Sequence, residues 1–196
     1  MRTVLKGIFF AFLFFFPYKI FAFNAIVLNE NVLNDKVIKE INLIGKELYD
    51  KTGIFVGVAI ADQTPFEDLF KLQEQLIKPN VLLILSKISH KVDIIGTKDS
   101  LLFFDKNKVL SPYSGTGTIL PILTSSKGKD VFNAAVLNGY ADICDKIAKY
   151  FNLELENSIG NANRDTINIL RILIYGFICF SLLYFVQRKM KRKRNG

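Results

Sequence analysis

The sequence predicts an α/β fold with a single mixed β-sheet and helices packed on its faces, plus one C-terminal transmembrane helix. Three observations predict it. Helix-like and strand-like apolar patterns alternate along the chain. One strand-like run is apolar throughout, which is typical of a strand covered on both faces. An apolar stretch of about 20 residues lies near the C-terminus, and the roughly 140 residues between the two apolar ends are enough for one domain with its own core.

The first predicted element is an amphipathic helix over Asn34–Lys51. Its apolar residues recur at intervals of three and four, so they share one face, and Asn34 or Asp35 can cap its N-terminus. Gly53 is expected to end it. The following run, Ile54–Ala61, is apolar throughout and rich in β-branched residues, and it predicts a central strand covered on both faces.

A second helix is expected after Thr64 and Pro65, which are a cap residue followed by proline, and Pro79 should stop it. Two strands follow, at Val81–Ser86 and Val92–Ile95. Because only a short polar turn separates them, they are expected to pair as an antiparallel hairpin.

The second half of the domain is less regular until its last helix. A short helix is expected at Ser100–Phe104, and a loop at Ser111–Thr118, where proline and glycine gather. A long helix follows over Asp130–Phe151, with the aspartate as its cap. These elements define one domain over residues 23–153, followed by a polar tether over 154–166. One mixed sheet with helices on its faces accommodates their order.

The N-terminal residues 1–22 have the layout of a secretory signal peptide. Arg2 and Lys6 precede an unbroken apolar run over Ile8–Phe16, and Ala22 is the small residue expected at the cleavage site. The alternative is that this segment stays uncleaved as a membrane anchor.

The second apolar segment, residues 167–186, is predicted to be a transmembrane helix, because about 20 residues at 1.5 Å each match a hydrocarbon core of about 30 Å. A basic tail over 187–196 follows, and clusters of this kind stay on the cytoplasmic side. We therefore expect a single span in the cytoplasmic membrane, with the domain in the periplasm. The basic residues expected to hold this orientation are Arg188, Lys189, Lys191, Arg192, Lys193 and Arg194.

The positive charge of the chain belongs to its two ends. Of the 26 lysines and arginines, 16 lie between Phe23 and Thr166, together with all 18 acidic residues. The domain is therefore close to neutral, and the formal net charge of +8 does not indicate nucleic-acid binding. A nucleic-acid patch is the competing interpretation of the tail, but a basic run directly after an apolar span is typical of a stop-transfer signal.

Few residues of the domain are suited to catalysis or metal binding. His90 is the one histidine in the sequence, which excludes a zinc site built from several histidines. Four aspartates follow or lie near predicted strand ends, where their carboxylates could gather around Ca²⁺ or Mg²⁺. They are Asp62, Asp93, Asp99 and Asp105. Solvated loop carboxylates are the alternative, since their spacing matches no dedicated metal loop.

The order of elements and several short patterns resemble the TPM domain family over about Asn31–Leu153. These patterns are Val32-Leu33-Asn34 before the first helix, Lys51-Thr52-Gly53 after it, Val81-Leu82-Leu83-Ile84-Leu85, Ile119-Leu120-Pro121, and Gly128, Asp130, Ala134, Ala135 and Gly139 near the last helix. The family includes bacterial envelope proteins and a chloroplast thylakoid protein linked to photosystem II repair and acid phosphatase activity. The resemblance implies a mixed α/β sheet and one of two functions.

The first implied function is a non-enzymatic module that binds, assembles or surveys a membrane protein complex, so its expected partner is a protein of such a complex. The second is a metal-dependent acid phosphatase of the TPM type, in which several of the four aspartates would hold the cation. Where the family usually has an Asp-Arg turn, this sequence has Ser89-His90-Lys91, and after Gly96 it lacks the family's second glycine and glutamate. These departures favour the binding module.

Overall fold

A computed structural model of the chain describes residues 23–113, 115–125, 130–159, 170, 172–185 and 188. The predicted signal peptide and most of the predicted tether lie outside these residues. Of the basic residues expected to anchor the chain, only Arg188 is described, and it is helical and exposed.

Four strands form one mixed sheet, which confirms the predicted α/β fold with a single mixed sheet. β1 (Ile26–Asn29), β2 (Phe55–Ala61) and β3 (Asn80–Ser86) run parallel, whereas β4 (Lys91–Gly96) is antiparallel to β3. The order of the strands in space is their order in the chain. The predicted hairpin is therefore formed by β3 and β4.

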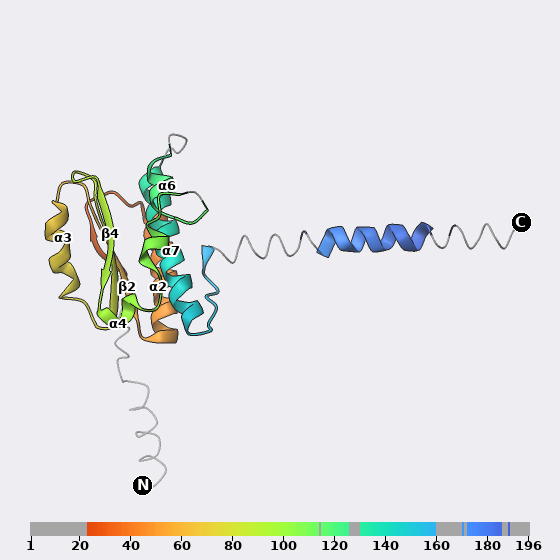
Figure 1. Ribbon diagram of the computed structural model, residues 1–196, viewed down its shortest axis with the longest axis horizontal. Helices are drawn as coiled ribbons and strands as arrows, with labels where there is room; N and C mark the ends of the chain where they lie inside the picture. Colours follow the sequence, from red (N-terminus) through yellow and green to blue (C-terminus); the bar gives the residue numbers. More distant parts are fainter. Residues whose placement is uncertain are drawn as a thin grey trace, which may run out of the picture.

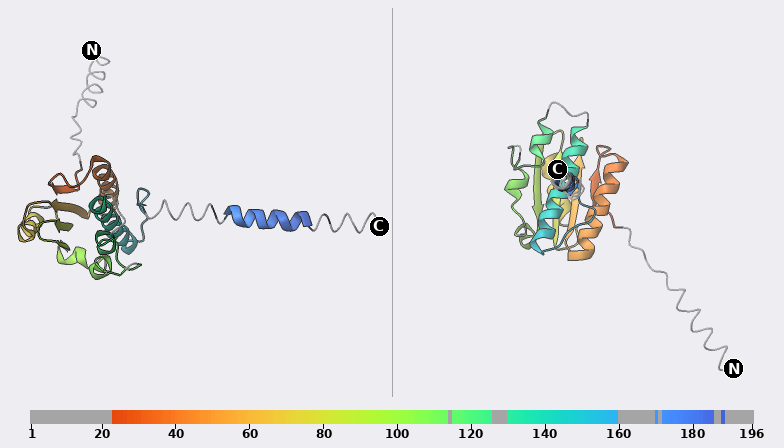
Figure 2. Two further views of the ribbon diagram at one scale, coloured as in Figure 1. Left: turned by 90° about the horizontal axis from the view of Figure 1, so that it is seen from above. Right: turned by 90° about the vertical axis from the view of Figure 1, so that its right-hand side faces the viewer.

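Helices cover both faces of this sheet (Figures 1 and 2). α2 (Asp35–Thr52) and the long α7 (Val131–Tyr150) lie together on one face, and α3 (Phe66–Gln73) lies on the other. Alternate residues of β3 divide between the two cores, because successive side chains of a strand point to opposite faces. Leu83 packs in the core with α2 and α7, whereas Leu82 packs in the core with α3.

The two crossover connections between parallel strands have opposite hands. β1, β2 and β3 advance across the sheet in one direction, but α2 crosses on one face and α3 on the other. Two such connections cannot both have the usual right hand. From the carboxyl ends of the neighbouring strands β1 and β2, the chain therefore continues to opposite faces of the sheet. In α/β sheets, ligand sites are commonly found at the carboxyl ends of such a pair of strands.

Hydrogen bonds at the helix ends explain why the predicted boundaries hold. The Asn34 side chain accepts a bond from the Val37 N–H at 3.0 Å and so caps α2. Gly53 follows the helix at φ 71°, a left-handed conformation that glycine adopts without steric cost. Asp130 caps α7 by accepting a bond from the Asn133 N–H at 3.4 Å.

Three short elements were not predicted from the sequence. β1 has four residues, and α5 (Lys106–Val109) and α6 (Leu120–Leu123) are single turns. Segments of this length are too short to show a helical or strand period. The predicted short helix is present as α4 at Lys98–Leu101, slightly earlier than expected, and α3 ends at Gln73, well before the proline expected to stop it.

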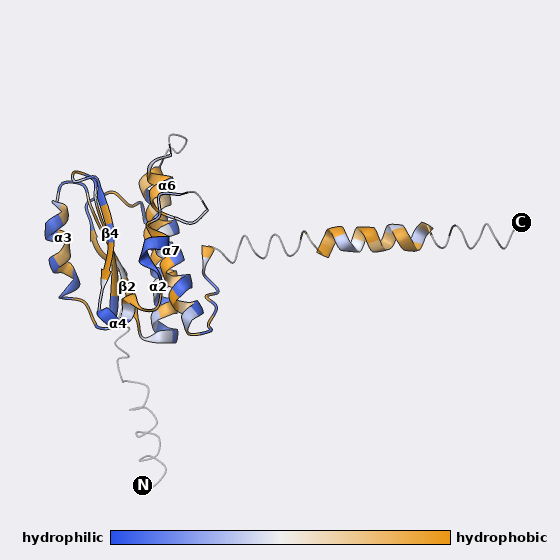
Figure 3. Ribbon diagram, viewed as in Figure 1, coloured by the Kyte–Doolittle hydropathy of each residue, from blue (hydrophilic) through white to orange (hydrophobic). Residues whose placement is uncertain are grey.

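The segment predicted to span a membrane is described in part. Residues 172–185 are helical, and Figure 3 shows that they are mostly hydrophobic. Within the residues that the structure describes, no helix is long and apolar enough to cross a membrane. The transmembrane helix therefore stays a prediction.

The beginning of the predicted tether lies against the domain. Leu155 and Ser158 are 2% and 4% exposed. The Glu47 carboxylate of α2 accepts bonds from the N–H groups of Glu156 at 2.7 Å and Asn157 at 2.9 Å. The packed part of the chain therefore continues past residue 153, the boundary that the sequence indicated, to about Ile159.

Candidate functional site

A cavity of about 330 Å³ opens at the carboxyl end of β3. The β3–β4 hairpin forms one wall, and α6 with the first turn of α7 forms the other. The lining is mainly apolar. It consists of Leu85, Ser86, Lys87, His90, Lys91, Val92, Leu120, Leu123, Thr124 and Phe132.

The cavity is apolar inside because the sheet register places apolar side chains there. Leu85 pairs with Val92 across β3 and β4, so their side chains share one face of the sheet. Leu120 and Leu123 of α6 and Phe132 of α7 line the opposite wall. Apolar walls of this kind are typical of pockets that bind the apolar part of a ligand.

Close packing fixes α6 against α7. Ile119, directly before α6, is fully buried against Gly139, where a Cβ would lie 2.3 Å from Ile119 Cγ1. The Thr118 hydroxyl donates to Asp142 Oδ2 at 3.0 Å and ties the same segment to α7. The helical wall of the cavity is therefore positioned by contacts within the domain.

Basic side chains surround the mouth of the cavity: Lys87, His90 and Lys91. Lys87 Nζ lies 5.2 Å from the centroid of the Phe132 ring and forms an ion pair with Asp62. Lys91 Nζ lies 3.1 Å from Glu67 Oε1, in a pair of exposed side chains. Neither acid lines the cavity. Because surface ion pairs are weak, both ammonium groups can turn to an anion bound at the mouth.

The hairpin turn that carries these basic groups is held to the β2–α3 loop. The Ser86 hydroxyl donates to the Thr64 carbonyl at 2.8 Å, and the Phe66 N–H donates to Ser89 Oγ at 3.1 Å. His90 adopts φ 51°, in the left-handed region where a histidine is uncommon. The turn is thus fixed by the domain itself rather than by a ligand.

A carboxylate of the chain lies at the carboxyl ends of β1 and β2. Glu30, directly after β1, accepts bonds from the N–H groups of Asp62 at 2.8 Å, Gln63 at 2.7 Å and Thr64 at 3.3 Å, and from the Thr64 hydroxyl. These bonds, the one from the hydroxyl foremost, hold the pKa of Glu30 below its usual range. Glu30 is therefore an internal anion that ties the edge strand β1 to the β2–α3 loop.

The four aspartates singled out as candidate Ca²⁺ or Mg²⁺ ligands lie at separate places. Asp62 follows β2 at the carboxyl ends of the parallel strands, where it pairs with Lys87. The pKa of Asp62 is lowered, chiefly by this bond. Asp99 lies in α4, at the opposite end of the strands, because β4 runs antiparallel to β3 and ends beside the first residues of β3.

The other two aspartates have partners of their own. Asp93 of β4 pairs with Lys106 Nζ at 3.0 Å, and Asp105 caps α5 by accepting a bond from the Asn107 N–H at 3.0 Å. In the described part of the chain, no group of three or more His, Cys, Asp or Glu side chains is placed to hold a metal ion. The phosphatase hypothesis required several of these carboxylates to converge, and no observation on them supports it.

Cys144 is a core residue of α7. It is fully buried, and burial raises the pKa of its thiol well above the usual value. Since the thiolate is the reactive form, this environment disfavours a nucleophile.

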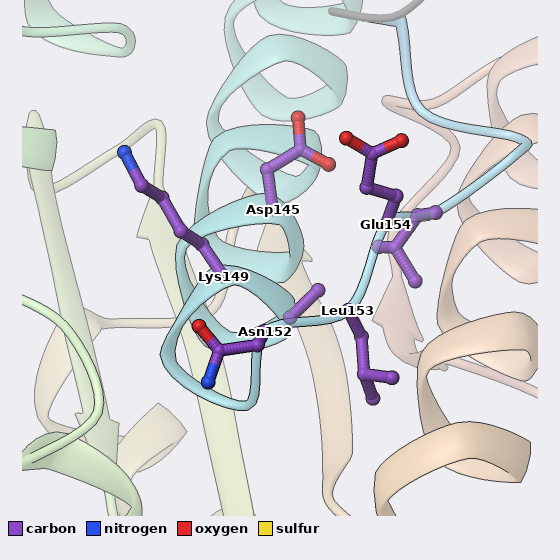
Figure 4. Close-up of a pocket in the computed structure, with 7 residues that line it drawn as sticks. Asp145, Lys149, Asn152, Leu153 and Glu154 are labelled. Atoms are coloured by element: carbon purple, nitrogen blue, oxygen red, sulfur yellow. The ribbon is translucent and has the colours of Figure 1, made fainter.

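A second cavity, of about 420 Å³, lies at the C-terminal end of α7 (Figure 4). Asp145 and Lys149 project from α7, and Glu154 projects from the segment that follows it. Burial raises the pKa of Asp145, whose Oδ2 accepts a bond from the Ser158 hydroxyl at 2.5 Å. The lining carries charges of both signs and is as polar as it is apolar, so it favours no single class of ligand.

The sequence did not indicate the first cavity. Its walls come from residues 85–92 and 120–132, which are well separated in the chain and meet only in the folded domain. Of its lining residues, only His90 was considered for chemistry, and it is exposed in the hairpin turn. The available signal was the pair Leu120 and Leu123, apolar residues between the predicted loop that ends at Thr118 and the predicted helix that begins at Asp130.

The sequence matches none of the protein-family models with which it was compared, and no curated protein matches it. The TPM resemblance therefore remains an expectation. The basis for assigning a function is the geometry of the cavity.

Proposed function

We infer that this chain is a membrane-anchored, TPM-like binding module that holds a segment of a partner protein from a membrane complex. The observation that carries this proposal is the apolar cavity at the carboxyl end of β3, with Lys87 and Lys91 at its mouth. The ligand that suits it is a peptide segment with one or two apolar side chains and a carboxylate.

The size of the cavity supports a small apolar anchor. At about 330 Å³ it is near the lower end of the range of about 300–1,000 Å³ for ligand pockets. One or two side chains fit this volume better than a whole cofactor does. The two ammonium groups supply charge-assisted hydrogen bonds to a carboxylate, which are about twice as strong as bonds between neutral groups.

Anchorage to the cytoplasmic membrane is the second part of the proposal. It is supported by the signal-like N-terminus, the apolar segment 167–186 and the basic residues from Arg188 to Arg194. In this arrangement the domain is extracytoplasmic. A tethered domain has a raised effective concentration toward partners in the same membrane, so a modest affinity for the peptide is enough.

Site-specific photo-crosslinking of the full chain in the membranes of its native host tests the proposal. Benzoylphenylalanine in place of Thr124, exposed at the cavity mouth, should give one discrete protein adduct, and in place of Lys39, exposed on α2, it should not. Adding Phe132→Ala removes the ring that lines the cavity and should abolish the adduct. Equal adducts from both positions, or an adduct that survives Phe132→Ala in a folded protein, would contradict the proposal.

The charge of the ligand has its own test. Lys87→Gln and Lys91→Gln should each reduce the yield of the Thr124 adduct, because each removes an ammonium group from the mouth of the cavity. Lys71→Gln is the matched control, since Lys71 is an exposed lysine of α3 outside the cavity. A yield that does not change in either mouth variant would show that the ligand has no carboxylate at this position.

A further inference from the structure

Three aromatic rings form a partly exposed cluster at the C-terminal end of α7. The ring centroids of Phe103, Tyr150 and Phe151 lie 4.9–5.2 Å apart. Tyr150 is 56% exposed and Phe151 40%. Leu102, next to Phe103 in the chain, is 76% exposed, the highest value for a large apolar residue among those described from 23 to 159. Apolar groups gathered in this way mark a surface that contacts something other than water.

The chemistry of this cluster suits the interface of a bilayer. Aromatic and aliphatic side chains are favoured at the level of the lipid headgroups, where a ring has one apolar and one polar side. Exposed Lys149 adjoins Tyr150 and lines the cavity in Figure 4, but Asp145 and Glu154 line it too. Contact of the apolar side chains with lipid is therefore the expected attraction, and charge is not.

The covalent chain limits how far this surface can be from the membrane. Eight peptide steps separate Ile159 from Ile167, the first residue of the predicted span, and they reach at most about 28 Å. A compact domain of about 137 residues has a radius of gyration of about 14 Å and hence a diameter of about 37 Å. A domain on so short a tether cannot turn freely without touching the bilayer.

We propose that Leu102, Phe103, Tyr150 and Phe151 form a membrane-docking surface that lies in the interfacial region of the anchoring membrane. The occupant of this surface is the lipid of the outer leaflet. The inference depends on the proposed membrane anchor but not on the peptide ligand of the first cavity. Docking holds the domain in one orientation and leaves the mouth of that cavity, at the opposite end of β3, turned toward other proteins.

Quenching by brominated lipid tests this surface, because the chain contains no tryptophan. Phe151→Trp places a single fluorophore in the cluster. Phe70→Trp is the matched control, since Phe70 is 41% exposed and lies on α3, on the other side of the sheet. In the full chain reconstituted in nanodiscs, lipids brominated near the glycerol end of their acyl chains should quench Phe151→Trp and leave Phe70→Trp unchanged, each relative to the same variant in unbrominated lipid.

Two further measurements distinguish a variant that does not fold from a missing anchor and from a missing docking surface. Leu102→Trp alters only an exposed side chain, so it replaces Phe151→Trp if that variant loses its native circular dichroism, and it should also be quenched. Flotation of each variant with liposomes checks the anchor separately. A chain that does not float would overturn the anchor and the docking surface together. A chain that floats, with no quenching in the cluster or with equal quenching at position 70, would overturn the docking surface alone.

Discussion

Replacing Gly45 with alanine should destabilise the domain, although alanine is the better helix former. Gly45 lies on the buried face of α2, opposite Tyr140 of α7. A Cβ at this position would be 2.1 Å from Tyr140 Oη and 3.0 Å from Phe23 Cε1. Tyr140 has little room to move, because it is fully buried and its hydroxyl donates to the Val56 carbonyl at 3.0 Å.

The expected magnitude follows from two opposing effects. Helix propensity favours alanine over glycine by about 1 kcal/mol. Forcing an extra methyl group into a packed core costs about 1–3 kcal/mol, and the 2.1 Å contact places Gly45→Ala in the upper part of that range. We expect a net loss of about 1–2 kcal/mol in the free energy of unfolding. Tyr140→Phe alone should cost about 1 kcal/mol through its lost hydrogen bond.

The double variant separates this explanation from a general weakness of α2. Tyr140→Phe removes the atom nearest to the new Cβ, so the two losses should not add, and their coupling should be about 1 kcal/mol. Urea unfolding of residues 23–159, followed by circular dichroism, measures each value. This fragment contains every residue described as buried, from Ala25 to Ser158. A Gly45→Ala domain as stable as the wild type, or additive losses in the double variant, would refute the reasoning.

Three further substitutions in the same fragment test its buried and bonded carboxylates. Glu47→Gln should lower the melting temperature at pH 7. Burial acts to raise the pKa of Glu47, but bonds from Lys51 and from residues 156 and 157 bring this pKa to about 2. The stabilisation by the Glu47 carboxylate is therefore present above pH 4.5 and is lost as the pH falls toward 2. Asp145→Asn should not lower the melting temperature, because burial raises the pKa of Asp145 and its charged form therefore costs stability as the pH rises. A markedly lower melting temperature of Asp145→Asn at pH 7 would contradict this explanation. Glu30→Gln should speed hydrogen exchange at residues 62–64 at neutral pH, and because the pKa of Glu30 is lowered, the difference from wild type should shrink in acid; a difference that does not depend on pH would argue against the carboxylate clamp.

The parts of the fold that could be predicted are those encoded in neighbouring residues. Asn34 and Gly53 are cap residues that act within one turn of α2, and the apolar run after Gly53 needs burial on both faces wherever it lies. β1 could not be predicted because its four residues become a strand only by pairing with β2. The opposite hands of the crossovers depend on which face of the sheet each helix covers, and no local pattern records that choice.

The candidate site was harder to predict for a related reason. Leu85 and Phe132 look like ordinary core residues in the sequence, and only the packing of α6 against α7 leaves space between them. Asp62 attracted attention as a possible metal ligand, whereas its carboxylate pairs with Lys87 at the cavity mouth. The sequence indicated polar groups at the carboxyl ends of these strands but not the apolar cavity beside them.

The hydrogen bonds of residues 153–158 also determine how the domain would respond to a pull from the proposed membrane anchor. After a turn at Asn152, at φ 56°, this segment runs back along α7, where the Leu153 N–H donates to the Ala148 carbonyl at 2.9 Å and Ser158 reaches Asp145. A load from that proposed anchor would reach the bond of Ser158 first and the helix last. Peeling residues 153–159 away would add about 25 Å to the reach of the chain. Residues 153–159 can therefore be packed on the domain or released from it, and the carboxylates of Glu47 and Asp145 hold the packed, shorter form.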